Sequence, residues 1–385
     1  MELGKFGVTT IEKYGFAGCI NLIKADLSKI NTINYSSFES CINFAGEGNG
    51  DLRLPSLISI GNEAFGGYKV QCIGLRRILD LGSITILPDA ADNYSGVFRN
   101  QINLTEVHLP ETLTTIGSKC FEDCTSLADI NFPSSLTTIK AYAFSGCTAL
   151  EIEDLSLPNL ETIGLSAFSG VKITKISNLG KLTSLPNINR DQNIFGDKTT
   201  LVSVNLPSTL TSIGNYVFGG YSSLTSVNLP LSLTSIGNHA FSNCSALASV
   251  FFPSSLTSIG SNAFEKCTSL TNVNFPSSIT SIKDSTFSGC TALESINLSS
   301  SLTNIGSYAF NNCSALTNIN LPASLTTIGS YAFSNCTSIT GIIDLPNLET
   351  LGQDAFCISD SKTGSLTGIE NLGKITAINN ATNGN

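Results

Sequence analysis

SIGNHAFSNCSALASVFFPSSLTSIGSNAFEKC, residues 235–267, opens and closes on the same pattern, S-I-G-x-x-A-F-x-x-C. The two copies of this pattern are 23 residues apart, and phenylalanine keeps the spacing along much of the chain. Two series of phenylalanines show it, at 98, 121 and 144, and at 195, 218, 241, 264, 287, 310, 333 and 356. A fixed period of this kind is typical of a repeat protein, in which each unit packs against its neighbours.

The repeat unit reads L-T-x-[VI]-N-[LF]-P-x-S-L-T-S-I-G-x-[YNS]-A-F-x-x-C-[TS]-[AS], and its residues are numbered here as positions 1 to 23. Phenylalanine at position 18 anchors each unit, and Phe16, Phe38, Phe65 and Phe168 anchor less regular copies. An L-x-x-[VI]-x-[LF] core within such a period indicates a leucine-rich solenoid. We therefore predict a repeat solenoid, a curved leucine-rich-repeat arc of about 15 units with parallel short strands and few or no helices.

Local patterns predict two short extended segments in each unit. In residues 224–230, Val227 and Leu229 alternate with polar residues, as in a half-buried strand. All prolines are assigned to position 7, where Pro230 ends this strand because proline has no N–H for the ladder. The second segment, residues 232–237, ends at Gly237, where we expect a turn with positive φ.

The domain prediction is a single leucine-rich-repeat solenoid over residues 1–385. Its sections are irregular N-terminal repeats at 1–100, regular repeats at 101–150, irregular repeats with insertions at 151–200, regular repeats at 201–340 and an irregular C-terminal end at 341–385. Both ends fall inside a repeat. Either these degenerate ends cap the solenoid, or the chain is a fragment of a larger surface protein.

The charge balance excludes some partners. Lys and Arg total 20 against 29 Asp and Glu, and the basic residues do not cluster, so we expect no nucleic acid as a partner. No apolar run approaches the length of a membrane span, which argues against membrane insertion. The N-terminus also lacks the pattern of a signal peptide.

Nine of the 12 cysteines occupy position 21. Stacked copies at the strand spacing of about 4.8 Å place their Cβ atoms too far apart for a disulfide. Since C-x-x-C pairs are also missing, we predict a row of buried free thiols in place of disulfides or a metal site. Cys72, Cys120 and Cys357 are out of register, and we expect at least one of them to be exposed.

Unit by unit, sequences such as LTSVNLPLSLTSIGNHAFSNCSA resemble the BspA-like leucine-rich repeats, a class with a 23-residue repeat. The resemblance covers nearly the whole chain, and the Pro, Gly, Phe and Cys positions all agree. It implies a ligand-binding solenoid on a cell surface or secreted, with adhesion to host extracellular matrix or to other cells. It supplies no catalytic residues and no cofactor.

Binding residues are sought in rows that point out of the stack. Position 5 of the first strand is mostly Asn, which we expect to form an amide ladder, and Phe251 interrupts it as an outward apolar residue. Position 16 carries Tyr216, His239, Tyr308 and Tyr331, whose rings either contact a ligand or shield the phenylalanine row. We predict ligand-binding roles for these five residues.

An insertion interrupts the repeats between Phe168 and Phe195, where the spacing grows to 27 residues. Its sequence NINRDQNIFGDK gathers charged residues and is either a contact loop or neutral drift. A calcium site over residues 191–196 is rejected, because Phe195 takes a ligand position as the core anchor. Charge is uneven nearby: residues 199–343 hold five charged side chains, whereas acidic residues crowd 106–154 and favour basic partners there.

Catalysis is not expected, because His108 and His239 lie far apart in sequence, and a catalytic site would require an acid to orient one of them, whereas the sequence reveals no clustered acid–base pair. No catalytic, cofactor-binding or metal-binding residues are predicted. The prediction is a non-catalytic binding module, a cell-surface adhesion protein that recognises host matrix protein or glycan. The alternative is a structural spacer or an intracellular protein-protein interaction scaffold. Both leave the oligomeric state open.

Overall fold

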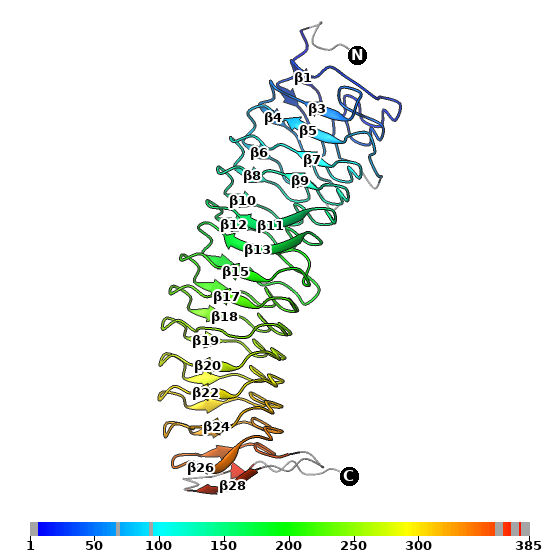
Figure 1. Ribbon diagram of the computed structural model, residues 1–385. Coiled ribbons are helices and arrows are strands. Elements are labelled where there is room, and N and C mark those ends of the chain that lie inside the picture. Colours follow the sequence, from blue (N-terminus) through cyan, green and yellow to red (C-terminus); the bar gives the residue numbers. More distant parts are fainter. Residues whose placement is uncertain (1–6, 67–69, 92–94, 359–364, 371–376, 379–385) are drawn as a thin grey trace. The chain divides into compact units, whose positions relative to one another are not determined.

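The computed structural model describes residues 7–66, 70–91, 95–358, 365–370 and 377–378. The chain forms two compact units, residues 1–182 with 192–197, and residues 183–191 with 198–385. In both units the chain coils into a parallel β-solenoid, with about 15 turns in total and no helix among the described residues (Figure 1). The predicted fold class is therefore confirmed, while the description of the chain as one domain stays a prediction.

Two ladders of short parallel strands join the turns. In the regular repeats, positions 3–5 form the first ladder and positions 12 and 13 form the second. Ser226–Asn228 (β17) pairs in register with Ser203–Asn205 (β15), so that identical residues lie side by side. Ser235–Ile236 (β18) pairs in the same way with Ser212–Ile213 (β16).

Within the first unit, the first ladder contains β3 (Asp51–Arg53), β5 (Arg77–Asp80), β7 (Glu106–Val107), β9 (Asp129–Ile130), β11 (Glu151–Ser156) and β13 (Lys172–Asn178). The second ladder of that unit contains β1 (Thr10–Ile11), β2 (Thr32–Ile33), β4 (Ser59–Ile60), β6 (Ile86–Leu87), β8 (Thr115–Ile116), β10 (Thr138–Ile139) and β12 (Thr162–Ile163).

Within the second unit, the first ladder continues after β15 and β17 with β20 (Asn272–Asn274), β22 (Ser295–Asn297), β24 (Asn318–Ile319), β26 (Thr340–Asp344) and β28 (Ser365–Glu370). Its second ladder contains β14 (Ser184–Leu185), β16, β18, β19 (Ser258–Ile259), β21 (Ser281–Ile282), β23 (Asn304–Ile305), β25 (Thr327–Ile328), β27 (Thr350–Leu351) and β29 (Ala377–Ile378).

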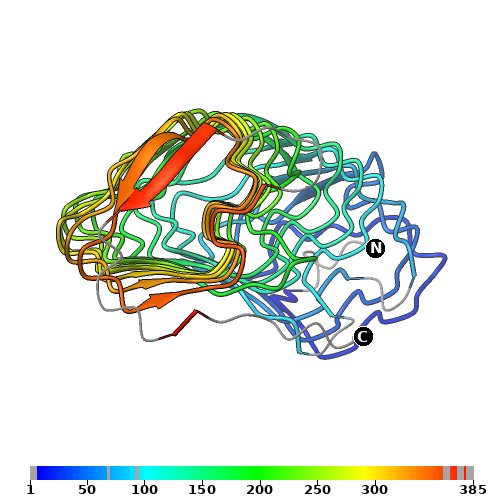
Figure 2. The ribbon, with the colours of Figure 1, turned by 90° about the horizontal axis from the view of Figure 1, so that it is seen from below.

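The segment after the second strand forms a third set of hydrogen bonds between turns. The backbone N–H groups of Tyr216, Phe218 and Gly220 donate to carbonyls of the next turn at 3.0, 2.8 and 2.7 Å. Successive turns therefore keep the same path, and in the second unit they overlay closely when seen along the stack (Figure 2). This path carries the anchor phenylalanines into the core.

The core is a continuous stack of aromatic rings within each unit. Phe218, Phe241 and Phe264 are fully buried, and their ring centroids are 5.2 Å apart at each step with nearly parallel planes. Offset stacking of this kind adds to the free energy of burial. Because each ring packs against the rings of both neighbouring turns, a single turn has no core of its own.

The cysteine row lies beside this stack. All 12 cysteines are free thiols, and Cys244 and Cys267 are fully buried. The Cys267 thiol donates to the carbonyl of Phe241 at 3.2 Å, and the same bond recurs from Cys244 to Phe218 at 3.0 Å. The prediction of a buried thiol row is confirmed, except that Cys19 is exposed. Of the out-of-register cysteines, Cys357 is exposed as expected.

Gly237 does not have the positive φ predicted for it, and that expectation is wrong. A Cβ atom on Gly237 would lie 2.6 Å from the backbone carbon of Gly214 in the preceding turn. Glycine avoids this contact, because the backbones of successive turns approach closely there. The left-handed conformation occurs instead at position 16 and at position 20, the residue before the cysteine.

The predicted repeat position of two prolines is also wrong. Pro88 and Pro186 directly follow the second-ladder strands β6 and β14, so they occupy the glycine position and not position 7. Their repeats carry insertions, which shift the frame when it is counted from the anchor phenylalanine. Proline cannot donate a backbone hydrogen bond at this position, whereas Gly237 donates to Ile213 at 2.8 Å.

The thiols give a direct test of burial. In the native protein at about pH 8, we expect Cys19 and Cys357 alone to react with Ellman's reagent, since the thiolate is the reactive form. Burial raises the pKa of Cys147, Cys244 and Cys290 to about 12. All 12 thiols should react after unfolding in guanidinium. More than two fast-reacting thiols in the native protein would contradict the buried row.

The two classes of glycine should respond differently to substitution. Gly237→Ala should lower the free energy of unfolding by about 1–3 kcal/mol, because the added Cβ meets backbone. Gly170 has a φ of +86° and nothing nearer than 3.7 Å to an added Cβ, so Gly170→Asn should cost less than about 1 kcal/mol. Urea unfolding measures both. Equal losses would show that close approach does not set the glycine at position 14.

Candidate ligand-binding site

The aromatic row at position 16 lies where the backbone is left-handed. Tyr216, His239, Tyr308 and Tyr331 have φ values of 60, 54, 58 and 58°. Such values are uncommon for these residue types and persist because the inter-turn hydrogen bonds on both sides fix the backbone. The fold thus sets the backbone conformation of this row.

The rings of this row pack in two pairs. Tyr216 and His239 stack with centroids 4.6 Å apart and planes 7° apart, and Tyr308 and Tyr331 stack at 4.9 Å and 12°. Tyr308 is 43% exposed, while the other three are partly exposed. The row is therefore on the surface, as required of contact residues. Its role in binding stays a prediction.

The insertion brings charged residues to the first of these pairs. A cavity of about 500 Å³ opens beside Tyr216 and His239. It is lined by Arg190, Asp191, Lys198, Tyr216, Gly219, Gly220, His239, Ser242, Asn243, Glu265 and Lys266, all of which belong to the second unit. Tyr216 and His239, both predicted to bind a ligand, thus lie beside the insertion, for which the sequence left open either a contact loop or neutral drift.

Charges of both signs surround this cavity. The Lys198 ammonium donates to the carbonyl of Arg190 at 3.1 Å, and burial lowers the pKa of Lys198 while Asp191 opposes that shift. Glu265 lies 3.6 Å from the Lys266 ammonium and 4.0 Å from His239 Nδ1. Three cationic side chains face two carboxylates, so the cavity has a cationic excess in a chain that is acidic overall.

The surroundings of His239 favour its neutral form. Burial lowers the pKa of His239, and Arg190 lowers it further, whereas the Glu265 carboxylate acts in the opposite direction. A neutral imidazole keeps one donor and one acceptor nitrogen for a ligand. The stacked pair thus offers hydrogen bonds as well as an aromatic surface.

The other predicted residues do not line this cavity. Phe251 is 78% exposed, and it lies where the first ladder is interrupted between β17 and β20, with an isolated bridge from Ser249 to Asn272. Its outward orientation is confirmed. The neighbouring amide ladder is present where Asn228 donates to Asn205 at 2.9 Å. A hydrogen bond to Asp354 raises the pKa of Tyr331, so the second pair is partly engaged within the protein.

Sequence reasoning missed Asn243, Glu265 and Lys266 as lining residues. Position 20, which holds Asn243 and Lys266, has left-handed backbone in most regular repeats. The signal available in the sequence was the residue choice there, mainly Gly and Asn, which favour that conformation. Position 20 lies four residues after position 16 in the same repeat, and both positions line the same cavity.

Both histidines have an acid close by, contrary to the expectation. Glu106 Oε1, on β7, lies 2.8 Å from Nε2 of His108, the residue that follows the strand, and Glu265 lies near His239 as described. The His108 side chain is 54% exposed, which is typical of a surface ion pair. Burial raises the pKa values of Cys244 and Cys290, which makes these thiols poor nucleophiles.

Phe195 is fully buried as the core anchor of its repeat, as the rejection of a calcium loop assumed. In the part of the chain that the structure describes, no three His, Cys, Asp or Glu side chains converge as metal ligands. None of the described segments forms a helix with the length and hydrophobicity needed to cross a membrane.

The sequence matches the family described as BspA type leucine rich repeat region, over residues 2–82, 76–189, 188–290 and 257–383. The chain belongs to this family. The BspA-type repeats identified from the spacing of phenylalanine, glycine and cysteine are therefore confirmed as such. A search of curated proteins found no match to the chain.

Solved structures with similar folds include three bacterial proteins. A leucine-rich repeat protein from Bacteroides ovatus is 24% identical, with coverage of 77% of this chain and 88% of that one and a TM-score of 0.47. A leucine rich cell surface protein from Faecalibacterium prausnitzii is 23% identical, with coverage of 91% and 90% and a TM-score of 0.43. The pneumococcal vaccine antigen PcpA is 18% identical, with coverage of 97% and 85% and a TM-score of 0.41.

His239 should make stability depend on pH. Because its pKa is lower in the folded protein than the ordinary value of 6.5, the unfolded chain takes up the proton more readily. Stability should be retained above the ordinary pKa and fall as the pH drops through it toward 5. The matched variant is His239→Asn, since Asn262 occupies the same position with a φ of 58°. A wild-type urea midpoint that falls no further than that of His239→Asn between pH 7.5 and 5 would contradict this shift.

Proposed function

We propose that this chain is a non-catalytic binding module, displayed at a cell surface or secreted, that adheres to host matrix protein or glycan. The observation that carries the proposal is the cavity at Tyr216 and His239, where an insertion adds charge to an aromatic pair. Membership of a leucine-rich repeat family supports a binding role. The exposed residues Phe251 and Tyr308 and the partly exposed Tyr331 are proposed as secondary contacts.

The distribution of charge supports this choice of site. Residues 199–343 contain five charged side chains, and two of them, Glu265 and Lys266, line the cavity. The insertion contributes Arg190, Asp191 and Lys198 to the same place. A partner that combines an apolar face with an acidic group fits both features, because rings supply contact area and cations supply orientation.

The rival function is a structural spacer or intracellular scaffold, in which the solenoid itself holds other domains or proteins apart. The insertion favours binding over this role. A spacer needs the regular turns alone, whereas the cavity exists because one repeat departs from them. Ligand recognition by repeat proteins commonly uses such insertions.

The test is surface binding of the purified chain to an array of matrix proteins and glycans. Arg190→Gln with Tyr216→Asn should weaken saturable binding by roughly tenfold or more, because a stacked ring and a guanidinium are both lost. Asparagine is the matched replacement for tyrosine, since Asn262 has the same left-handed backbone.

Two controls locate the contact. Tyr308→Asn with Tyr331→Asn removes the other aromatic pair, and Phe251→Asn restores the common residue of its row. We expect both controls to bind nearly as wild type does. An equal loss in either control would move the contact away from the cavity. No binding across the array by folded protein would leave the spacer or scaffold as the function.

A further inference from the structure

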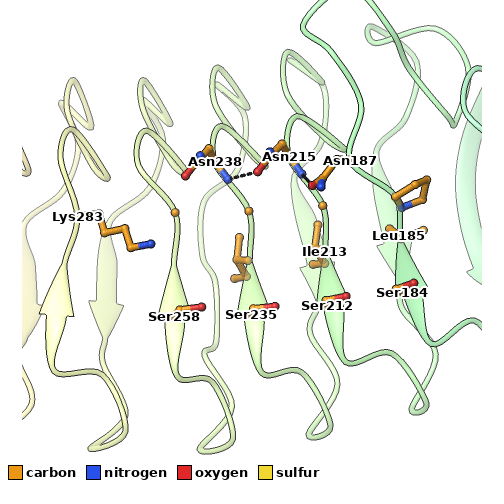
Figure 3. Close-up of a pocket in the computed structure, with 15 residues that line it drawn as sticks. Ser184, Leu185, Asn187, Ser212, Ile213, Asn215, Ser235, Asn238, Ser258 and Lys283 are labelled. Carbon is orange, nitrogen blue, oxygen red and sulfur yellow. Dashed lines mark hydrogen bonds between the residues drawn. The ribbon is translucent and has the colours of Figure 1, made fainter.

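A second concave surface crosses the second ladder of the second unit (Figure 3). It has a volume of about 510 Å³, and its floor includes the backbone of Gly214, Gly237 and Gly260. These glycines occupy position 14, so no side chain fills the space above them. Pro186 and Lys283 take that position in the flanking turns and mark the two ends of the groove.

A row of hydroxyl groups follows one side of this groove. Ser212, Ser235 and Ser258 stand in register on β16, β18 and β19, and their hydroxyls point the same way in Figure 3. All three are half-buried, and none of their hydroxyls bonds to another described residue. Each hydroxyl can donate and accept, so the row is available to a polar ligand.

A row of amides follows the other side. The side-chain oxygen of Asn187 accepts from the backbone N–H of Asn215 at 2.8 Å, that of Asn215 from Asn238 at 2.8 Å, and that of Asn238 from Ser261 at 2.9 Å. These bonds fix the orientation of each amide, as Figure 3 shows for the first two. The NH₂ groups donate to no described residue. The groove thus presents oriented donors that need no reorganisation to bind.

The spacing and charge of the groove select its ligand. Its polar groups repeat once per turn, at about 4.8 Å, and Lys283 is the one charged residue among those that line it. An extended peptide advances about 3.3 Å per residue and falls out of step with the turns. It also finds no free strand edge, since β16 and β18 are paired on both sides. A chain of pyranose rings advances by about one ring length per unit, which is close to the spacing of the turns.

We propose that this groove binds a linear, largely uncharged polysaccharide that runs across β14, β16, β18 and β19. Its hydroxyls pair with the serine row on one side and the asparagine NH₂ groups on the other. Lys283 favours an acidic substituent at its end of the groove. The proposal rests on the proposed binding function and names a ligand class for it, but it does not depend on the cavity at Tyr216.

The test is calorimetric titration of the purified full chain with β-1,4-linked hexasaccharides of glucose, mannose and xylose, and with the matching trisaccharides. At least one hexasaccharide should bind roughly tenfold tighter than its trisaccharide, because it reaches polar groups of additional turns. Equal affinity of the two lengths would overturn periodic recognition along the groove.

Two sets of variants assign the binding to the groove. Asn215→Asp with Asn238→Asp removes the NH₂ donors but keeps the turn, because Asp284 already accepts from the next turn at 2.8 Å at this position. This variant should bind the hexasaccharide at least tenfold more weakly. Ser212→Ala with Ser235→Ala and Ser258→Ala should do the same.

The matched control, Ser203→Ala with Ser226→Ala, changes the first ladder and should leave binding unchanged. Arg190→Gln with Tyr216→Asn separates this proposal from the proposed function. If that pair alone weakens hexasaccharide binding, the ligand lies in the cavity and the groove proposal fails. If folded protein binds array ligands but no hexasaccharide, the groove proposal fails while the binding function stands.

Discussion

Hydrogen bonding of each turn to the next is the constraint on which the rest of the structure depends. Three sets of backbone bonds connect successive turns, at the two strand ladders and at the segment that carries the anchor phenylalanine. These bonds fix the distance between successive turns, and this distance brings the phenylalanine rings into stacking contact. The same distance brings the turns so close at Gly237 that an added Cβ atom would lie 2.6 Å from the backbone of Gly214.

Regular repeats place the same residue types on the surface of every turn, so one turn differs little from the next. Departures from the repeat pattern shape the two concave surfaces described in the second unit. One is lined by the charged insertion before Phe195, and the other extends between Pro186 and Lys283, which replace glycine. The two surfaces use adjacent residues of the same turns. Asn215 and Asn238 line the groove, and the residues that follow them, Tyr216 and His239, line the cavity.

Much of the fold was predictable because the repeat fixes the same environment many times. The strand at Ser226–Asn228, the buried Phe241 and the buried Cys244 each follow from a position whose residue type recurs. The role of Gly237 was not predictable in this way, because positive φ and close backbone approach both select glycine. Pro186 was misplaced because an insertion breaks the count from which its position was taken.

The candidate site was predictable only in part. Outward residues such as Phe251 and Tyr308 follow from the repeat pattern, because alternation along a strand and turn position determine exposure. The meeting of Arg190 with His239 does not, since the path of an insertion depends on tertiary packing that no periodicity encodes. Glu106 beside His108 could have been predicted from the sequence, because alternation along a strand places side chains two residues apart on the same face.

The left-handed backbone at position 16 couples the surface chemistry of the repeat to its geometry. The described residues with this conformation at that position include Lys119, Tyr142, His239, Asn262 and Asp354, and they differ widely in charge and size. β-Branched side chains are disfavoured by such a backbone, so Val, Ile and Thr are filtered out while most polar and aromatic residues remain. Duplication of a repeat therefore copies a surface position at which the backbone already restricts the residue types to those suited to contact. Diversification at that position can alter recognition one turn at a time while the coil beneath it stays the same.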